Sequence, residues 1–211
     1  MPDTAQRPRK ERKENADRRR RQLLNAARRS IVRNGLTKTT LATVAAEAGL
    51  SQGVAAFYFK SKGGLLTETL RDLYKGYEDH WVAALEAAGP APAERLRALI
   101  GADFHLEACG PSTLPLWFAF WGELRSQEHY DEVAESFDGR RREVLLGIWT
   151  ALLGDAERAS ANQMAEWMDT LTDGYWQRLH LSPETISRLE AETAAWDCLV
   201  RLVPDLLGRS E

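Results

Sequence analysis

The stretch TKTTLATVAAEAGLSQGVAAFYFKSKGGLL, residues 37–66, decides the fold, because its spacing predicts two short helices joined by a tight turn and followed by a third helix. Apolar residues recur at helical spacing from Leu41 to Ala48, after a threonine that can serve as N-cap, and Gly49 supplies a permissive residue that ends this helix. Ser51 can cap the next helix. Two helices arranged in this way indicate a helix-turn-helix, whose second helix enters the major groove of DNA.

Basic residues surround this motif. Residues 18–35, RRRRQLLNAARRSIVRNG, predict a preceding helix that closes at Gly35. Residues 1–62 hold 15 Lys and Arg against 5 Asp and Glu, whereas the remainder holds 13 against 26. The overall charge of −3 therefore divides into +10 and −13, so the first part can bind DNA phosphates and the second would be repelled by them.

The spacing resembles the TetR family of bacterial repressors. The positions that carry the resemblance are Gly35, Thr40, Val44, Ala45, Ala48, Gly49, Ser51, Gly53, Tyr58, Phe59, Lys60, Lys62 and Leu65. The resemblance implies an all-α homodimer with an N-terminal three-helix helix-turn-helix DNA-binding domain and a C-terminal helical ligand-binding and dimerisation domain. We expect a flexible basic arm at 1–17, the DNA-binding domain at 18–62 and the second domain at 63–211.

Every segment after residue 62 favours helix, and none shows the alternation of a strand. A long helix is expected from Ser61 to Leu85, where it would act as the lever between the domains. Further helices are expected at 92–109, 113–125, 128–153, 157–180 and 183–207, with Pro183 in the first turn of the last. The total of nine is the number that the TetR family has.

Contacts to double-stranded operator DNA are assigned by chemistry and by the resemblance. The carboxamide of Gln52 can pair with adenine or reach a phosphate, and the alternative is a merely solvated residue at a helix start. The small and aromatic side chains at 55–57 can contact thymine methyl groups. The resemblance implies phosphate contacts from Tyr58 and Lys60. The full set of expected DNA-binding residues is Thr40, Ser51, Gln52, Gly53, Ala56, Phe57, Tyr58, Lys60 and Lys62. The charge run at 18–21 is either solvated or touches the neighbouring groove.

All seven tryptophans lie outside the DNA-binding part. Trp117 and Trp121 share one helix face, and Asp169, Asp173 and Trp176 share a stripe of another. A single tryptophan is more often core filler, but each buried indole N–H needs a partner, so seven are a demanding way to fill space. Clustered ring faces attract a cation, and a quaternary ammonium fits best because it has no N–H to satisfy.

A narrower resemblance agrees with this chemistry. The stretches 49–72, 96–104, 114–130 and 171–179 resemble the choline-responsive repressors of glycine betaine synthesis within the family. This implies choline or a related quaternary ammonium as effector, and an operator near genes for choline uptake and oxidation. The expected ligand-binding residues are Asp103, Trp117, Phe120, Trp121, Tyr130, Asp173 and Trp176. The alternative is a TetR-type regulator of efflux or catabolic genes that responds to another hydrophobic or cationic small molecule.

Dimerisation is expected through a four-helix seam. Its expected residues are Trp167, Leu171, Leu189, Trp196, Leu199 and Leu202.

Other function classes find little support in the sequence. Cys109 and Cys198 lie far apart, and the histidines at 80, 105, 129 and 180 are scattered, so we expect no disulfide, metal or cofactor. The pairs Asp169 with Asp173 and His105 with Glu107 lack any catalytic motif, which argues against an enzyme. No stretch is typical of a signal peptide or a membrane span, so we expect a cytoplasmic protein with no membrane partner.

Overall fold

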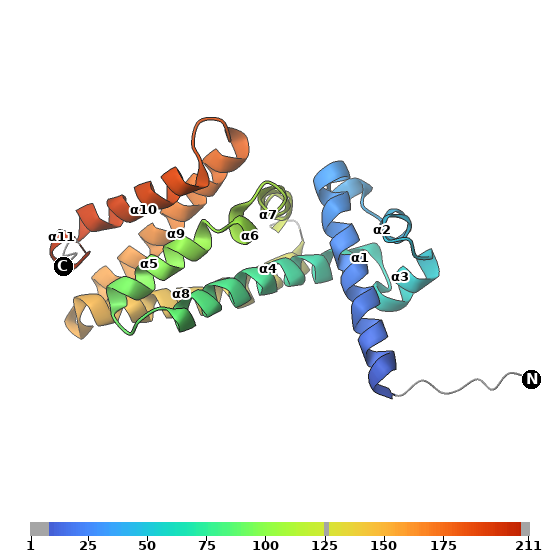
Figure 1. Cartoon of the computed structure of the whole chain (residues 1–211), viewed down its shortest axis with the longest axis horizontal. Helices are drawn as coiled ribbons and strands as arrows, with labels where there is room; N and C mark the ends of the chain where they lie inside the picture. Colours follow the sequence, from blue (N-terminus) through green and yellow to red (C-terminus); the bar gives the residue numbers. More distant parts are fainter. Residues whose placement is uncertain (1–8, 125–126, 208–211) are drawn as a thin grey trace, which may run out of the picture. The chain divides into compact units, whose positions relative to one another are not determined.

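The computed structural model describes residues 9–124 and 127–207, and its regular elements within these ranges are all helical (Figure 1). This confirms the all-α fold predicted from the sequence. The chain divides into two compact units, residues 1–72 and 73–211. The predicted domain boundary at residue 62 lies at the start of helix α4, Lys62–Ala87, whereas the observed division falls inside that helix.

The first unit contains three helices and the beginning of α4. These helices are α1, Arg9–Lys38, α2, Leu41–Glu47, and α3, Gln52–Phe59. Helical geometry is interrupted in α1 at Gly35, which has a φ of 76° and stands where the sequence predicts the end of the helix. The flexible arm predicted at 1–17 is wrong for residues 9–17, which are helical because Arg, Lys and Glu have high helix propensity. Residues 1–8 lie outside the described residues.

An apolar core joins the helices of the first unit. Leu23 and Leu24 of α1, Val44 of α2 and Ala55 of α3 are all at most 1% exposed. The other buried members are Ala26, Ala27, Ala45, Ala48, Phe59 and Leu65. These positions follow the helical spacing of the sequence, so burial of one face of each short helix holds the unit together.

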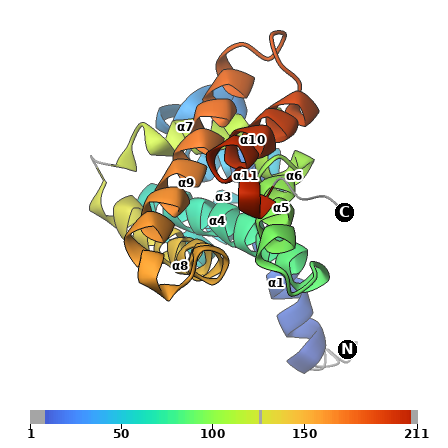
Figure 2. The same ribbon diagram turned by 90° about the vertical axis from the view of Figure 1, so that its left-hand side faces the viewer.

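The second unit is a bundle around helix α9, Arg158–Leu181, which lies between α8, Glu128–Leu153, and α10, Arg188–Leu202 (Figure 2). Helix α5, Pro92–Asp103, packs against both α8 and α10. The shorter elements are α6, Leu106–Cys109, α7, Leu114–Trp121, a 3-10 turn at Asp155–Glu157, and α11, Pro204–Leu207.

Two helices predicted for this unit are wrong in extent. The helix predicted at 92–109 breaks after Asp103, where His105 caps α6 by accepting a hydrogen bond from the Glu107 backbone N–H. The helix predicted at 183–207 starts at Arg188 and breaks at Val203, so Pro183 precedes it and Pro204 begins α11. The start is set by a capping box in which Ser187 and Glu190 each accept a hydrogen bond from the other's backbone N–H.

Smaller differences remain at other helix ends. Helix α7 stops at Trp121, four residues before the predicted end, and residues 125 and 126 lie outside the described residues. With the breaks in α5–α6 and α10–α11, the described residues form eleven α-helices where nine were predicted. Within these residues, no helix is long and apolar enough to cross a membrane.

Candidate functional site

The turn between α2 and α3 is fixed by short-range hydrogen bonds. Thr40 Oγ1 accepts from the Thr43 backbone N–H at 3.1 Å, while Thr43 Oγ1 accepts from the Thr40 backbone N–H at 2.8 Å. Gly49 has a φ of 64°, which a residue with a Cβ rarely adopts. Ser51 then caps α3 by accepting from the Val54 backbone N–H at 3.4 Å. This is the helix-turn-helix geometry that the sequence predicts, and each cap is a residue that was assigned to DNA contact.

Helix α3 has one buried face and one exposed face. Ala55 is fully buried and Phe59 nearly so, which contradicts the expectation that Ala55 could reach a thymine methyl group. Phe57 is 77% exposed, an unusual state for a large ring in a folded protein. Ser51, Gln52, Gly53 and Lys60 are exposed too, whereas Thr40, Ala56, Tyr58 and Lys62 are half-buried. The exposed face therefore presents an amide, a ring and a cation.

Two lysines follow α3 and differ in their environments. Lys60 is exposed and has a φ of 62°, in the left-handed region where a side chain is strained. The Lys62 Nζ donates a hydrogen bond to the Thr37 carbonyl oxygen at 2.5 Å, so it ties the start of α4 to the end of α1. Of the two lysines, Lys60 is therefore the more available to bind a DNA phosphate.

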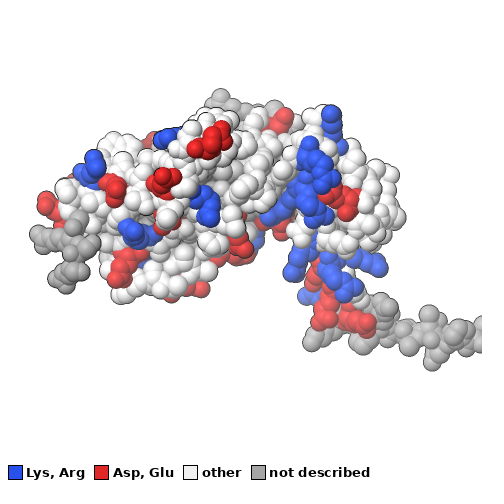
Figure 3. All heavy atoms as spheres, turned by 45° about the horizontal axis from the view of Figure 1, so that its top comes forward, with Lys and Arg blue, Asp and Glu red and all other residues white. Residues whose placement is uncertain are grey.

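Several arginines of the first unit form ion pairs within it. Glu47 forms ion pairs with Arg29 at 2.9 Å and with Arg33 at 3.2 Å. Arg20, in the predicted charge run, forms an ion pair with Glu68. Figure 3 shows Lys and Arg side chains gathered over this unit, in keeping with its excess of positive charge.

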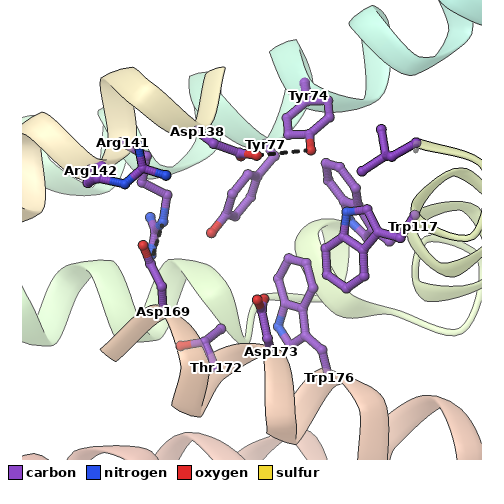
Figure 4. Close-up of a pocket in the computed structure, with 12 residues that line it drawn as sticks. Tyr74, Tyr77, Trp117, Asp138, Arg141, Arg142, Asp169, Thr172, Asp173 and Trp176 are labelled. Carbon is purple, nitrogen blue, oxygen red and sulfur yellow. Dashed lines mark hydrogen bonds and ion pairs between the residues drawn. The ribbon is translucent and has the colours of Figure 1, made fainter. Parts of the chain in front are cut away.

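The second unit contains a cavity of about 390 Å³ with an aromatic and a charged part. Its aromatic lining comes from Tyr74 and Tyr77 of α4, Trp117 and Trp121 of α7, and Trp176 of α9 (Figure 4). The other lining residues are Leu124, Asp138, Arg141, Arg142, Asp169, Thr172 and Asp173. Residues 102 positions apart in the sequence, from Tyr74 to Trp176, therefore meet at one site.

The rings of this pocket are close to one another and held in place. The Trp117 ring centroid lies 4.8 Å from that of Tyr74 and 5.9 Å from that of Trp176. Trp121 and Trp176 are nearly parallel, at 14° and 6.2 Å. The Trp117 indole N–H donates to the Ala108 carbonyl oxygen at 3.1 Å, and that of Trp176 donates to the Asp103 carbonyl oxygen at 3.0 Å. Because these N–H groups are satisfied by the backbone, the indole orientations are fixed.

A buried ion pair lies behind the pocket. Asp103 is 0% exposed and pairs with Arg141 Nη2 at 2.8 Å, and it also accepts a hydrogen bond from the Tyr77 hydroxyl at 2.6 Å. Arg141 Nε in turn donates to Asp169 at 3.3 Å. Burial raises the pKa of Asp103 above its ordinary value, although Arg141 and Tyr77 act in the opposite direction. The ion pair holds α5, α8 and α9 together at the pocket.

Two carboxyl groups in the pocket are poised to titrate near neutral pH. Burial, with the nearby Asp169 and Asp103 carboxylates, raises the pKa of Asp173 to about 7. Burial also raises the pKa of Asp138 to about 6, against a hydrogen bond from the Tyr74 hydroxyl at 3.4 Å. Burial makes both carboxyls easier to protonate than in water, and a cation beside them would lower both pKa values and favour the ionised form.

The structure places only some of the predicted ligand-binding residues at the pocket. Trp117, Trp121, Asp173 and Trp176 line it. Asp103 is buried behind the pocket wall, so it positions Arg141 and Tyr77 instead of lining the cavity. Phe120 and Tyr130 are also buried and pack against each other, with ring centroids 5.5 Å apart, outside the cavity lining.

Sequence reasoning missed the charged wall of the pocket and its tyrosines. Asp138, Arg141 and Arg142 lie on one side of α8, at spacings of three and four residues. The same spacing of charged residues is typical of a solvated helix face, so it did not indicate a pocket. Tyr74 and Tyr77 are three residues apart on α4, and this spacing could have been noticed. Leu124 and Thr172 were missed as well, and Asp169 was placed on the stripe of Asp173 and Trp176 without a ligand-binding role.

Four of the six predicted dimer residues line a partly exposed apolar groove on α9 and α10. The groove has a volume of about 600 Å³, and Trp167 and Leu202 line it at 44% and 45% exposure, with the buried Leu199 in its floor. Leu171 lines it too, while Leu189 is 72% exposed outside it. Trp196 does not line the groove, and its ring packs against the Arg97 guanidinium of α5 at 4.8 Å.

Two further predictions concern cysteine and histidine. Both cysteines are free, Cys109 is buried and Cys198 lines the groove on α9 and α10. The expectation that the histidines are scattered is wrong for His80 and His105, whose rings stack with centroids 4.3 Å apart. They are brought together because α4 packs beside the junction of α5 and α6, which the sequence spacing could not reveal.

The fold and these surfaces define a helix-turn-helix transcription regulator whose second unit carries a small-molecule pocket. Residues 23–69 match the family described as bacterial regulatory proteins, tetR family, and residues 92–204 match the one described as BetI-type transcriptional repressor, C-terminal. The chain belongs to the TetR family, with a BetI-type C-terminal domain. Members of this family bind operator DNA and act as dimers, and they are regulators and not enzymes.

Relatives and solved structures agree with this assignment. The chain is 33% identical over 188 residues to the HTH-type transcriptional regulator BetI of Burkholderia mallei, covering 88% of this chain and 93% of that protein. For BetI of Burkholderia ambifaria the identity is 34% over 183 residues, with 85% and 91% covered. A transcriptional regulator from Pseudomonas aeruginosa PAO1 has a similar structure, with a TM-score of 0.78, 26% identity, and 88% and 90% covered.

A second solved structure shares the fold at lower identity. It is a transcriptional regulator from Saccharomonospora viridis in complex with choline, with a TM-score of 0.74, 21% identity, and coverage of 86% of this chain and 95% of that one.

Proposed function

We propose that this regulator represses genes of choline uptake and glycine betaine synthesis, and that choline or a related quaternary ammonium is the effector bound in the aromatic pocket. The observation that carries the proposal is the joining of five ring faces and three carboxyl groups in one cavity. The choline complex of the Saccharomonospora viridis regulator supports the same effector class, and the relatives named BetI support a regulator of the BetI type.

The ring faces supply attraction for a cation without requiring hydrogen bonds from it. Each cation–π contact contributes about 0.5–2 kcal/mol, more when the cation is desolvated. Trp117 and Trp176 already use their indole N–H groups on backbone oxygens, so their faces are what they offer to a ligand. A methylated ammonium has no N–H left to satisfy, so it can enter such a site without leaving a buried donor unpaired.

The charged side of the pocket complements the other features of choline. Asp138, Asp169 and Asp173 provide negative charge close to the rings. Arg141 lines the cavity as well, and its buried Nη1 has no hydrogen-bond partner in the part of the chain that the structure describes. A hydroxyl oxygen of the effector is the kind of group that would accept a hydrogen bond from it.

The DNA contacts are proposed on the exposed face of α3. Gln52 and Phe57 are exposed there and suit base contacts, and Lys60 suits a phosphate. Ser51 and Thr40 act as helix caps and, with Gly53, Ala56, Tyr58 and Lys62, make up the rest of the proposed interface. Because a regulator of this family has to reach operator DNA inside the cell, we place the protein in the cytoplasm.

Effector action follows from dimer geometry. Two DNA-binding units read successive major grooves when they are about 34–36 Å apart or a multiple of this distance. We place the dimer contact on the groove of α9 and α10, where Trp167, Leu171 and Leu202 expose apolar surface. An effector that favours another separation lowers operator affinity by its difference in binding free energy between the two states. Helix α4 is suited to this coupling because it begins after α3 and contributes Tyr74 and Tyr77 to the pocket.

The test compares choline with its uncharged carbon isostere, 3,3-dimethylbutan-1-ol. Calorimetric titration of the purified protein should show saturable binding of choline and at least tenfold weaker binding of the alcohol. Trp121→Ala should weaken choline binding, because Trp121 lines the pocket. Trp196→Ala is the matched control, because this tryptophan is also half-buried but packs against Arg97 outside the pocket.

Two outcomes would count against the proposal. Equal binding of both compounds would show that the pocket does not select for charge, and would favour a regulator of efflux or catabolic genes with another hydrophobic effector. An unchanged choline affinity in Trp121→Ala would place the ligand elsewhere.

A further inference from the structure

A cluster of potential metal ligands lies outside the aromatic pocket. His80 comes from α4, His105 stands immediately before α6, and Glu107 lies within α6. One ligand atom from each of these side chains lies within 4.8 Å of the others. The two imidazole rings stack with their centroids 4.3 Å apart and their planes at 27°. None of the three residues lines the effector pocket.

The donor set selects a class of cation. Imidazole nitrogen suits zinc, copper and nickel, and a carboxylate oxygen is an accepted third ligand, whereas magnesium and calcium prefer oxygen alone. Zinc binds nitrogen at about 2.0–2.1 Å, so tetrahedral ligand atoms lie about 3.4 Å from one another. The longest separation in the cluster would therefore have to shorten from 4.8 Å by up to about 1.4 Å, which falls within the reach of a side-chain rotation.

The three side chains differ in their freedom to make this adjustment. His80 is half-buried on a long helix, whereas His105 and Glu107 are exposed. The His105 Nδ1 accepts one hydrogen bond, from the Glu107 backbone N–H, at the long distance of 3.3 Å. A metal would compete for the lone pair of this imidazole with that single weak bond. The cluster thus has one anchored ligand and two that can close on a cation.

We propose that His80, His105 and Glu107 form a binding site for a divalent transition-metal ion of the zinc class. Three protein ligands leave a fourth position for water. The ion would link α4 to the junction of α5 and α6. It would do so next to the hydrogen bond between Tyr77 and Asp103, since Tyr77 precedes His80 by one helical turn and Asp103 precedes His105 by two residues. Binding would therefore stabilise the wall of the second unit that carries Tyr77.

The experiment uses the full chain, free of any affinity tag and treated with a chelator, and titrates it with Zn²⁺ by calorimetry. The expected result is one tight Zn²⁺ per chain and a melting temperature that rises with Zn²⁺. His105→Ser removes the imidazole but keeps a side chain that can cap α6, so it separates ligand loss from loss of the cap. We expect this variant and His80→Gln to bind Zn²⁺ more than about tenfold more weakly, and Glu107→Gln to show a smaller loss.

His129→Ala is the matched control, because His129 is an exposed histidine on α8 that is not part of the cluster and meets the Tyr130 ring edge-on. Its Zn²⁺ affinity should equal that of the unaltered protein. The proposal is overturned if the unaltered protein binds no Zn²⁺ at a ratio of one, if His105→Ser binds as tightly, or if His129→Ala loses as much. Choline binding, measured on the same variants, reports separately on the aromatic pocket.

Discussion

The two units differ in how far apart in the sequence the parts of their candidate sites lie. In the first unit the caps and the turn involve near neighbours, such as Thr40 with Thr43 and Ser51 with Val54. In the second unit the pocket joins residues of α4, α7, α8 and α9. A site built from one contiguous motif can be recognised in the sequence. In a pocket assembled from distant segments, only the most distinctive residue type, here tryptophan, can be recognised. The following predictions test this contrast, from the largest expected effect to the smallest.

The largest effect is expected where the second unit depends on a long-range ion pair. Arg141→Ala should lower the free energy of unfolding by about 3–5 kcal/mol, because it leaves the buried Asp103 carboxyl without its partner. Urea-induced unfolding at a fixed chain concentration measures this change. Arg140→Ala is the control, since Arg140 is 48% exposed in its pair with Glu78 and should contribute about 1 kcal/mol or less. Equal losses in both variants would contradict the role given to the buried pair.

Next in size is the pH dependence of choline binding. With the pKa of Asp173 at about 7, choline affinity should rise about tenfold from pH 6 to pH 8, because only the ionised carboxylate attracts the cation. The free energy of unfolding of the protein without choline changes with pH in the opposite direction. The same raised pKa makes this group lower the free energy of unfolding as pH rises from about 4, its value in the unfolded chain, through 7.

Calorimetric titrations at several pH values measure this dependence. Asp173→Asn should bind choline weakly with a much flatter pH profile, to which the lower pKa of Asp138, about 6, still contributes. Asp197→Asn, an exposed position on α10, should retain the full profile. A profile that is the same in Asp173→Asn and the unaltered protein would exclude Asp173 as the titrating group.

A smaller effect is expected from a cap in the first unit. Thr40→Ala should lower the free energy of unfolding by about 1 kcal/mol, because it removes the acceptor for the Thr43 N–H at the start of α2. Thr37→Ala provides the comparison, since Thr37 is exposed and its backbone carbonyl, which the substitution keeps, is the group that accepts from Lys62. Chemical unfolding measured by circular dichroism distinguishes the two variants. A loss in Thr40→Ala as large as that in Arg141→Ala would erase the contrast between local and long-range support.

The smallest effect is expected for one phosphate contact. Lys60→Gly keeps a residue that accepts the φ of 62° while removing the charge, and should weaken operator binding a few fold. The slope of log affinity against log salt should become shallower by about 1. Lys75→Ala, in the second unit and paired with Asp79, should leave the slope unchanged. Fluorescence anisotropy with labelled operator measures both, and an unaltered slope in Lys60→Gly would remove this residue from the interface.

Much of the fold could be predicted, since hydrophobic spacing and cap residues are local signals. Both ends of α2 and the start of α3 follow from Thr40, Gly49 and Ser51. The break after Asp103 was missed because His105 is an uncommon cap, and Pro183 misled because the Ser187 box is the stronger start signal.

The candidate sites could be predicted only in part. Trp117, Trp121 and Trp176 stood out by type, and the structure places all three at the pocket. Arg141 could not be recognised, because the sequence does not show whether a charged helix residue is solvated or pairs with a buried partner such as Asp103. The proximity of His80 and His105 depends on the packing of separate helices, and residue spacing in the sequence does not predict this packing.

The backbone at Lys60 has a consequence for anyone who redesigns this protein. A lysine held in the left-handed region carries a strain of about 1–2 kcal/mol that a glycine would relieve. A procedure that optimises folding energy alone would therefore replace it and report an improvement. The resulting protein would be more stable and, by the phosphate contact proposed for Lys60, a weaker repressor. Selection for thermostability and selection for regulation therefore act in opposite directions at position 60.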